Sequence, residues 1–213
     1  MLSIAIDGPA GSGKSTLAKL LAEELNIEYI DTGAMYRAIA LKSINLNKRT
    51  YNEIRSMLSD TTIDFINGKI YLDNEDVSDL IRTEEISKLA SDISKIDIVR
   101  KKLVDIQRNI ALRKSVVMEG RDIGTVVLKD ADYKFFLTAS IEARAKRRYK
   151  QLLDNGIDTD LKSIKEEIAK RDYNDENREN SPLIKADDAI FLDNSNMNLE
   201  DNLNFMLKVI RGN

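Results

Sequence analysis

The residues best suited to chemistry lie near the start of the chain, where Gly8-Pro9-Ala10-Gly11-Ser12-Gly13-Lys14-Ser15 fits G-x-x-x-x-G-K-[ST] at every fixed position. Glycines let the backbone curl so that successive N–H groups converge on phosphate oxygens, and the helix start behind them adds partial positive charge. Lys14 would reach the β- and γ-phosphates of a nucleotide, and Ser15 would hold Mg²⁺. An apolar run at 2–6 precedes the loop and a helical pattern follows it, which is the context that such a loop requires.

The sequence argues against two large classes of nucleotide-binding protein. Asn47-Lys48-Arg49-Thr50 lacks the Asp of a guanine-specific N-K-x-D, and no L-S-G-G-Q transporter signature occurs. Small phosphotransferases remain as the natural group. The apolar run at 115–118 ends in one carboxylate, Glu119, which joins Ser15 as a candidate ligand for Mg²⁺.

A second cluster, Asp31-Thr32-Gly33-Ala34-Met35-Tyr36-Arg37, follows a predicted strand at 28–30. Open α/β sheets bind ligands at the carboxyl ends of their strands. Arg37 is a planar donor suited to phosphate, and Tyr36 could border a base. The alternative is an ordinary helix start that Asp31 or Thr32 caps.

A third cluster, Glu119-Gly120-Arg121-Asp122-Ile123-Gly124-Thr125, follows the predicted strand at 115–118. Arg121 can grip a phosphate, while Asp122 can accept from an exocyclic amine or orient the arginine. The alternative is a turn that carries a surface ion pair.

Charged side chains also form two stripes on predicted helices, where spacings of 3, 4 or 7 place each set on one face. Neighbouring arginines repel by a few tenths of a kcal/mol, which an anionic ligand would offset, and arginines can neutralise a transferring phosphoryl group. The alternatives are a solvated basic face and a structural ladder of salt bridges. The stripes are Arg144, Arg147 and Arg148, and Arg171, Asp175 and Arg178. This number of arginines, with Arg100, favours an anionic acceptor over a neutral one such as a sugar.

The composition narrows the chemistry further. The 213 residues contain no Cys and no His, which excludes a disulfide framework, thiolate zinc sites and His-activated nucleophiles. A metal would therefore be a hard ion on oxygen ligands. The net charge of −3 argues against general nucleic-acid coating. The first residues are too short an apolar run for a signal peptide or a membrane span, and we expect a cytoplasmic protein.

The elements that must position these residues form an α/β pattern. Apolar strands alternate with helices, which predicts a parallel sheet with helices on both faces, although the strand order cannot be read. Asn67-Gly68 joins two short alternating runs and predicts a hairpin. We expect strands at 2–6, 28–30, 115–118, 133–138 and 189–192, a hairpin at 62–66 and 69–72, and helices at 14–25, 33–46, 51–58, 83–94, 97–113, 141–153, 161–177 and 199–210.

Taken together, these motifs resemble the bacterial cytidylate kinases, the CMP- and dCMP-specific members of the nucleoside monophosphate kinase group of P-loop kinases. The resemblance extends over nearly the whole chain in the family's order. Thr32 stands where some members have Ser, and Glu119 where some have Asp. The motifs are GPAGSGKST (8–16), DTGAMYR (31–37), EDVSDLIRT (75–83), EGRDIGTVV (119–127) and RDYNDENR (171–178).

The resemblance implies a domain organisation. The core would comprise about 1–60, 93–147 and 181–213, with a small mixed monophosphate-binding insert at about 61–92 and a helical lid over ATP at about 148–180. The protein would act as a monomer on small molecules, with no nucleic acid and no membrane as partner.

The resemblance also implies roles for single residues. ATP would lie on Gly8, Pro9, Ala10, Gly11, Ser12, Gly13, Lys14, Ser15 and Thr16. The base and ribose of CMP would lie against Thr32, Tyr36, Ser91, Arg100 and Asp122, with Asp175 at the ribose and Arg178 selecting cytosine. Arg37 and Arg121 would hold the CMP phosphate. Arg147, Arg148 and Arg171 would contact ATP or the transferring phosphoryl group, so that they, Lys14 and Arg121 are the expected catalytic residues.

The expected reaction is in-line transfer of the γ-phosphoryl group of ATP to CMP or dCMP, with Mg²⁺ as cofactor. Positioning and charge stabilisation suffice for this chemistry, so no side-chain nucleophile or strong base is needed. One alternative is a related kinase for UMP, AMP or a coenzyme A precursor. Another is a nucleotide-dependent switch or a nucleic-acid-binding P-loop protein, which the net charge and the second anion site disfavour.

Overall fold

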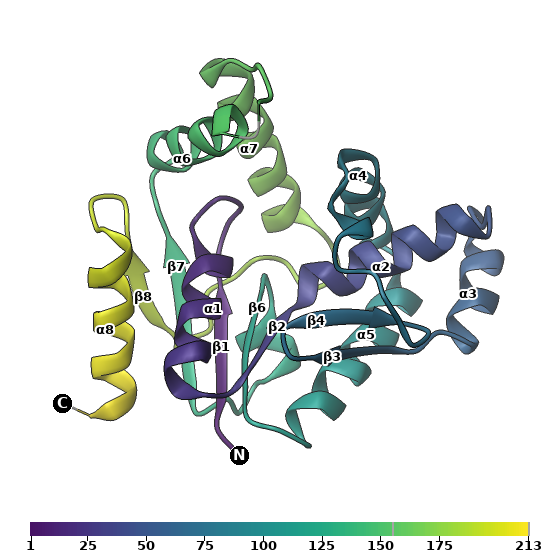
Figure 1. Ribbon diagram of the computed structural model, residues 1–213, viewed down its shortest axis with the longest axis horizontal. Coiled ribbons are helices and arrows are strands. Elements are labelled where there is room, and N and C mark those ends of the chain that lie inside the picture. The colour runs from purple at the N-terminus through teal and green to yellow at the C-terminus, as the bar shows by residue number, and fades with distance from the viewer. Residues whose placement is uncertain (155, 213) are drawn as a thin grey trace.

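The computed structural model describes residues 1–154 and 156–212, and its centre is a five-stranded parallel sheet (Figure 1). The strands lie in the order β2-β6-β1-β7-β8, so the chain's first strand is the middle one. Ile4 of β1 pairs with Val117 of β6 on one side and with Tyr133 of β7 on the other. The strands are β1 (Ser3–Asp7), β2 (Glu28–Asp31), β6 (Val116–Gly120), β7 (Tyr133–Thr138) and β8 (Ile190–Asp193).

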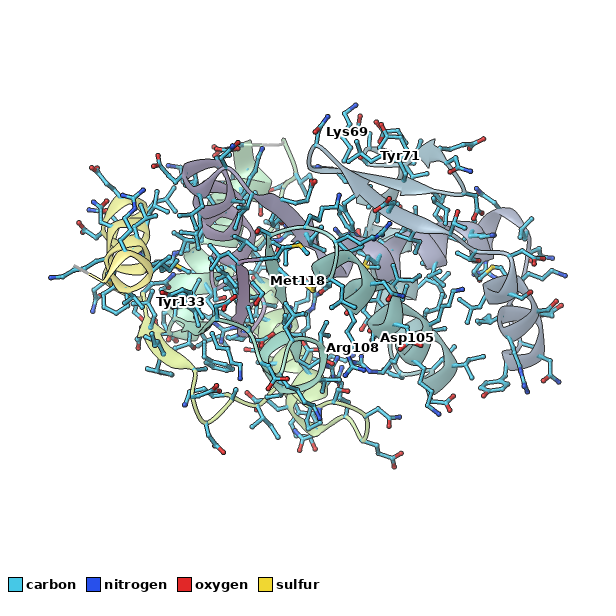
Figure 2. The ribbon with its side chains drawn as sticks, turned by 90° about the horizontal axis from the view of Figure 1, so that it is seen from below. Lys69, Tyr71, Asp105, Arg108, Met118 and Tyr133 are labelled. Atoms are coloured by element: carbon cyan, nitrogen blue, oxygen red, sulfur yellow. The ribbon has the colours of Figure 1, made fainter. Side chains whose placement is uncertain are left out.

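Alternation along the strands divides the core into two layers, because successive side chains point to opposite faces of a sheet. Ile4 and Ile6 belong to an apolar cluster with α1 (Lys14–Leu25) and α8 (Leu199–Arg211). Ala5, between them, belongs to the cluster formed with α2 (Thr32–Asn45) and α5 (Asp97–Ala111). Met118 of β6, labelled near the middle of Figure 2, is buried in this second cluster. The expected helix-covered parallel sheet is confirmed.

The insert contains a second, antiparallel sheet built from β3 (Ile63–Ile66), β4 (Lys69–Leu72) and β5 (Glu75–Asp76), followed by a short helix η1 (Leu80–Arg82) and α4 (Glu84–Ile93). Asn67 and Gly68 have φ values of 53° and 73°, the two left-handed residues that a tight type I′ hairpin needs. The predicted hairpin is confirmed. Its inward side chains Phe65 and Ile70 join the α2 cluster, while Lys69 and Tyr71 lie on its outer side (Figure 2).

The two helices α6 (Ile141–Asp154) and α7 (Leu161–Asn177) pack on each other and rise above the end of β7 in Figure 1. We call this pair the helical arm. It has a small apolar cluster of its own, made by Ala145, Ile164 and Ile168. Its packing unit begins at Ile141. The lid boundary near 148 stays a prediction.

Most predicted elements occur within one to three residues of their expected bounds, including α3 (Tyr51–Ser59), which begins with a capping box between Thr50 and Glu53. Three short elements were not predicted: β5, η1 and a π-helical turn η2 (Ile123–Val127) directly after Asp122. Among the described residues, no helix is long and apolar enough to cross a membrane.

Candidate functional site

The phosphate loop connects the end of β1 to the start of α1, as expected from the sequence. Gly11 and Gly13 have φ values of 73° and 90°, so the loop turns through left-handed backbone that favours glycine. A Cβ on Gly8 would lie 1.9 Å from the Leu137 carbonyl oxygen of β7, so only glycine fits there. Gly13 caps α1 without a side chain, which leaves the first amides of the helix free to face an anion.

Lys14 is buried at the first position of α1 and turns back over the loop. Its Nζ donates to the Pro9 carbonyl at 2.8 Å and to Ser12 Oγ at 3.4 Å. Burial, followed by the positive charge of Arg121, lowers the pKa of Lys14 to about 7. A phosphate at this point would reverse both effects, because a nearby negative charge favours the charged amine.

Ser15 and Glu119 lie together at the carboxyl edge of the sheet. Tyr29 Oη donates to Glu119 Oε1 at 2.8 Å, and the Ser15 side chain also interacts with this carboxylate. Burial, and then the negative charge of Asp31, raises the pKa of Glu119, while Lys14 lowers it. A hydroxyl and a carboxylate are hard oxygen ligands. Mg²⁺ commonly takes only one or two such ligands and completes its shell with water and substrate phosphates, so these residues fit the ion.

Arg37 faces the same region from the second turn of α2. Its Nη2 pairs with Asp31 Oδ2 at 2.7 Å, and Asp31 Oδ1 also caps α2 by accepting from the Ala34 amide at 3.0 Å. Thr32 is buried, and its Oγ1 donates to the Glu119 carbonyl at 2.7 Å. Asp31 therefore caps a helix start, as the alternative interpretation of this cluster expected. The helix that begins there positions Arg37 at the sheet edge.

Asp122 is the centre of a second charged group, beside Tyr36. It pairs with Arg100 Nη2 through one oxygen, and Arg178 Nη2 lies 3.6 Å from the other. The Arg100 guanidinium lies 5.8 Å from the centre of the Tyr36 ring, within cation–π range. Burial raises the pKa of Tyr36 to about 12, so the hydroxyl keeps its proton. Within the described residues, Arg178 Nη2 has no hydrogen-bond partner although it is buried.

In the part of the chain that the structure describes, Ser91 of the expected acceptor set makes no side-chain hydrogen bond to Asp122, Arg100 or Arg178. It lies in the last turn of α4 with its side chain exposed, and its carbonyl accepts from Ser94 Oγ at 2.8 Å. The carbonyl of Ser94, not a group of Ser91, binds Arg100 Nη1 at 3.2 Å.

Arg121 and Arg171 both act electrostatically on Lys14. Arg121 Nε pairs with Asp175 Oδ2 of α7 at 2.8 Å, so the arm touches the sheet edge here. Desolvation, and then the positive charges of Arg121 and Arg37, lowers the pKa of Arg171. The positive charges of Arg121 and Arg171 also lower the pKa of Lys14.

The three arginines of α6 have different surroundings, although the sequence places them on one face. Arg144 is buried and donates to the carbonyls of Ala10 and Ala139, each at 2.9 Å. Arg147 binds Asn194 through Oδ1 at 2.9 Å and through the carbonyl oxygen at 2.7 Å. Arg148 is exposed and donates to Gln151 of its own helix at 3.0 Å. The structure thus brings Arg144 and Arg147, but not Arg148, onto the phosphate loop and its surroundings.

Three polar residues at the site had no sequence-based assignment. Asp7 accepts from the amides of Ile123 and Gly124 at 2.8 and 2.7 Å, which links the phosphate loop to the Arg121-Asp122 turn. Asn194 Nδ2 donates to the Ser12 carbonyl at 2.8 Å. Asp172 accepts from the Ala10 amide at 3.3 Å. Asp7 and Asn194 directly follow or end strands, which is the one signal that could have marked them.

A cavity of about 480 Å³ opens beside this edge, between the outer side of α1 and the insert. It adjoins Ser15, Thr16 and Arg37. A space of this size at the carboxyl edge of a parallel sheet is typical of small-molecule sites.

Known proteins resemble this chain over nearly its whole length. The family model described as cytidylate kinase matches residues 4–212. A cytidylate kinase of Clostridioides difficile (strain 630) is 47% identical over 202 residues, which cover 94% of each chain. A cytidylate kinase of Caldicellulosiruptor saccharolyticus is 49% identical over 215 residues, covering 98% of this chain and 95% of that one.

Solved structures share the fold at low identity. An uncharacterized protein from Eubacterium ventriosum has a TM-score of 0.56 and 17% identity, covering 100% of this chain and 99% of that one. Shikimate kinase from Acinetobacter baumannii, in complex with shikimate, has a TM-score of 0.51 and 15% identity, covering 100% and 94%. These likenesses concern the fold alone. Because the family model and relatives nearly half identical extend over almost the entire sequence, the chain belongs to the cytidylate kinase family.

Proposed function

We propose that this protein transfers the γ-phosphoryl group of ATP to the phosphate of CMP or dCMP, giving CDP or dCDP and ADP. One observation supports the proposal: the charges of Arg121 and Arg171 both act on Lys14 of the phosphate loop, and those of Arg121 and Arg37 act on Arg171. Two polyanionic substrates must approach each other for this reaction, and such a group of cations stabilises both of them and the transition state.

On the donor side, the amides of the phosphate loop and Lys14 bind the β- and γ-phosphates. Ser15 and Glu119 would hold Mg²⁺, which supplies charge neutralisation between the phosphates when bound. Arg121 and Arg171 would stabilise the charge that builds up on the transferring group. No general base is required, because the acceptor phosphate is already anionic.

On the acceptor side, Arg37 and Arg121 take the phosphate of CMP. Asp122 offers carboxylate oxygens to the exocyclic amine of cytosine, and the unpartnered Nη2 of Arg178 is a donor for its carbonyl oxygen. Tyr36 and Arg100 border the base, Thr32 and Ser91 border the ribose region, and Asp175 takes a ribose hydroxyl. A uracil base presents an acceptor where cytosine has its amine, so Asp122 disfavours UMP.

The helical arm covers the donor side in this scheme. Arg147 and Arg148 approach ATP from α6, and closing the arm excludes water that would otherwise hydrolyse ATP. We place the enzyme in the cytoplasm, where it would act as a monomer.

Isothermal titration calorimetry with separate additions of Mg·ATP and CMP tests whether both sites exist. We expect each nucleotide to bind at one site per chain, and an Asp122→Asn variant to lose affinity for CMP while it retains ATP. Binding of ATP without binding of CMP would instead favour a nucleotide-dependent switch. Chelation of Mg²⁺ should abolish transfer but leave CMP binding, because Ser15 and Glu119 lie on the donor side.

A further inference from the structure

The helical arm contacts the phosphate loop at Ala10 through two side chains that have no role in the scheme above. Asp172 of α7 accepts from the Ala10 amide through Oδ1, and its Oδ2 pairs with Arg144 Nη1 at 2.6 Å. Arg144 of α6 in turn donates to the Ala10 carbonyl at 2.9 Å. The N–H and the C=O of Ala10 are therefore both hydrogen-bonded to the same ion pair, Arg144–Asp172.

This ion pair is shielded from solvent. The side chains of Arg144 and Asp172 are 8% and 13% exposed. The Ala139 carbonyl takes a further donor of Arg144, and a Cβ on Gly11 would lie 3.4 Å from the Arg144 Cβ, so the loop packs directly on this side chain. Removing one partner of a buried pair leaves the other charge uncompensated, so these contacts have a larger effect than a surface salt bridge.

The hydrogen bond of Asp172 is connected to Lys14 through one planar peptide group. The amide that Asp172 accepts from belongs to the Pro9–Ala10 peptide, and the carbonyl of that same peptide accepts from Lys14 Nζ at 2.8 Å. A peptide group is planar, so fixing its N–H fixes the direction of its C=O. Arg144 fixes the next peptide through the Ala10 carbonyl, and with it the direction of the Gly11 amide.

We propose that Asp172 and Arg144 are positioning residues that make the shape of the phosphate loop depend on docking of the helical arm. With α7 docked, the Pro9–Ala10 peptide holds Lys14, and the Ala10–Gly11 peptide directs its amide toward the donor phosphates. With α7 undocked, both peptides are free to rotate, and the loop binds ATP less well. This inference rests on the proposed function, because it assigns the docked arm to the ATP-binding state.

The test compares substitutions of this pair with a matched control on the same helix. D172A removes the acceptor and the charge, D172N keeps an acceptor oxygen and removes the charge, and E176Q removes one charge from an exposed position of α7. We expect D172N to weaken ATP binding about tenfold in calorimetry and to raise KM for ATP similarly, and D172A to do so more strongly. KM for CMP should stay within about twofold of the wild-type value, and E176Q should resemble the wild type.

The double variant R144Q/D172N provides a second readout. Because both side chains act on one residue of the loop, its loss of ATP affinity should be clearly smaller than the combined losses of the two single variants. If D172A fails to fold, D172N and the double variant still decide the question.

The proposal would be overturned by a D172N or D172A protein that has the wild-type unfolding temperature and binds ATP within about twofold of E176Q. Equal rises in KM for ATP and CMP would also contradict it, since they indicate a general loosening of the arm. Failure of the wild-type protein to phosphorylate CMP would instead reject the proposed function, while the calorimetric comparison of ATP binding would still test the positioning role.

Discussion

The insert and the helical arm are both additions to the same sheet, but different forces hold them in place. Phe65 and Ile70 of the insert are buried in one continuous cluster with Met35 and Ile39 of α2. The buried apolar side chains of the arm pack on one another, in the small cluster around Ile164. It meets the rest of the molecule through polar contacts, made by Arg144, Arg147, Asp172 and Asp175.

This difference indicates which region can move at low cost. Separating the insert from α2 would expose apolar surface, at about 25 cal/mol for each Å². The arm's partners are polar groups, such as the Arg121 guanidinium and the Ala10 amide and carbonyl, which water can also satisfy when the arm opens. The arm is therefore suited to opening and closing during a reaction cycle, while the insert is suited to holding Arg37 and Tyr36 in place.

The largest effect should come from Lys14 of the phosphate loop, which lies in neither region. Replacing Lys14 with Ala should lower kcat by about 10³-fold or more, because one preorganised charge at the transition state is lost. The unfolding temperature should not fall, since burial already disfavours the charged amine. Initial-rate assays and thermal unfolding check this, with the exposed Lys208→Ala as the control. Near-normal turnover of the Lys14→Ala variant would contradict the catalytic role proposed for Lys14.

A pair of core truncations separates the two regions by stability. Phe65→Ala should lower the free energy of global unfolding by about 3–5 kcal/mol, because it leaves a cavity in the shared cluster. Ile164→Ala should mainly speed local hydrogen exchange in α6 and α7, with a smaller effect on global unfolding, because its cluster is confined to the arm. Urea denaturation and native-state hydrogen exchange measure both. If both variants lost the same free energy of global unfolding, the insert and the helical arm would not differ in how they are held to the core.

The free energy of unfolding should depend on pH through Asp7 of the core. The sign of this dependence is opposite to the one that Asp76 on the surface of the insert produces. Burial raises the pKa of Asp7 from 3.8 to about 6, so the folded state retains this proton to higher pH than the unfolded state. The raised pKa of Asp7 therefore stabilises the folded state by up to about 3 kcal/mol. This stabilisation is fully present below about pH 4 and is lost as the pH rises through 6. The Asp76 carboxylate of the insert behaves oppositely, because hydrogen bonds from Lys69 and Ser78 hold its pKa below the usual range.

Urea unfolding of wild type and Asp7→Asn between pH 4 and 7 isolates the Asp7 contribution, since all other groups are shared. The wild-type stability should fall relative to the variant as the pH rises. Parallel curves would show that burial does not affect Asp7 in this way.

The smallest of these effects concerns Arg178, the point where the arm reaches the acceptor side. Arg178→Gln should raise KM for CMP about tenfold and leave KM for ATP nearly unchanged, because a charged donor beside Asp122 is lost. Steady-state kinetics with each substrate varied in turn measure this, and Arg113→Gln, at an exposed position in the turn after α5, is the control. A rise confined to KM for ATP would place Arg178 on the donor side instead.

The sequence predicted the parts of the molecule that local patterns determine. The phosphate loop and the Asn67-Gly68 hairpin follow from residue types that permit few other conformations. The π-helical turn η2 could not be predicted, because the Asp7 carboxylate, far away in the chain, accepts its first amides. Arg144 looked like a phosphate ligand from its spacing, yet it binds backbone carbonyls of the loop. Tertiary partners of this kind decide the role of a side chain, and the spacing of charges along a helix does not reveal them.

Initial rates with CMP, dCMP, UMP and AMP, under saturating ATP and Mg²⁺, test the central claim most directly. The arrangement of Asp122 and Arg178 predicts that CMP and dCMP are phosphorylated with clearly higher kcat/KM than UMP and AMP. A preference for AMP, or no transfer to any monophosphate, would contradict the account.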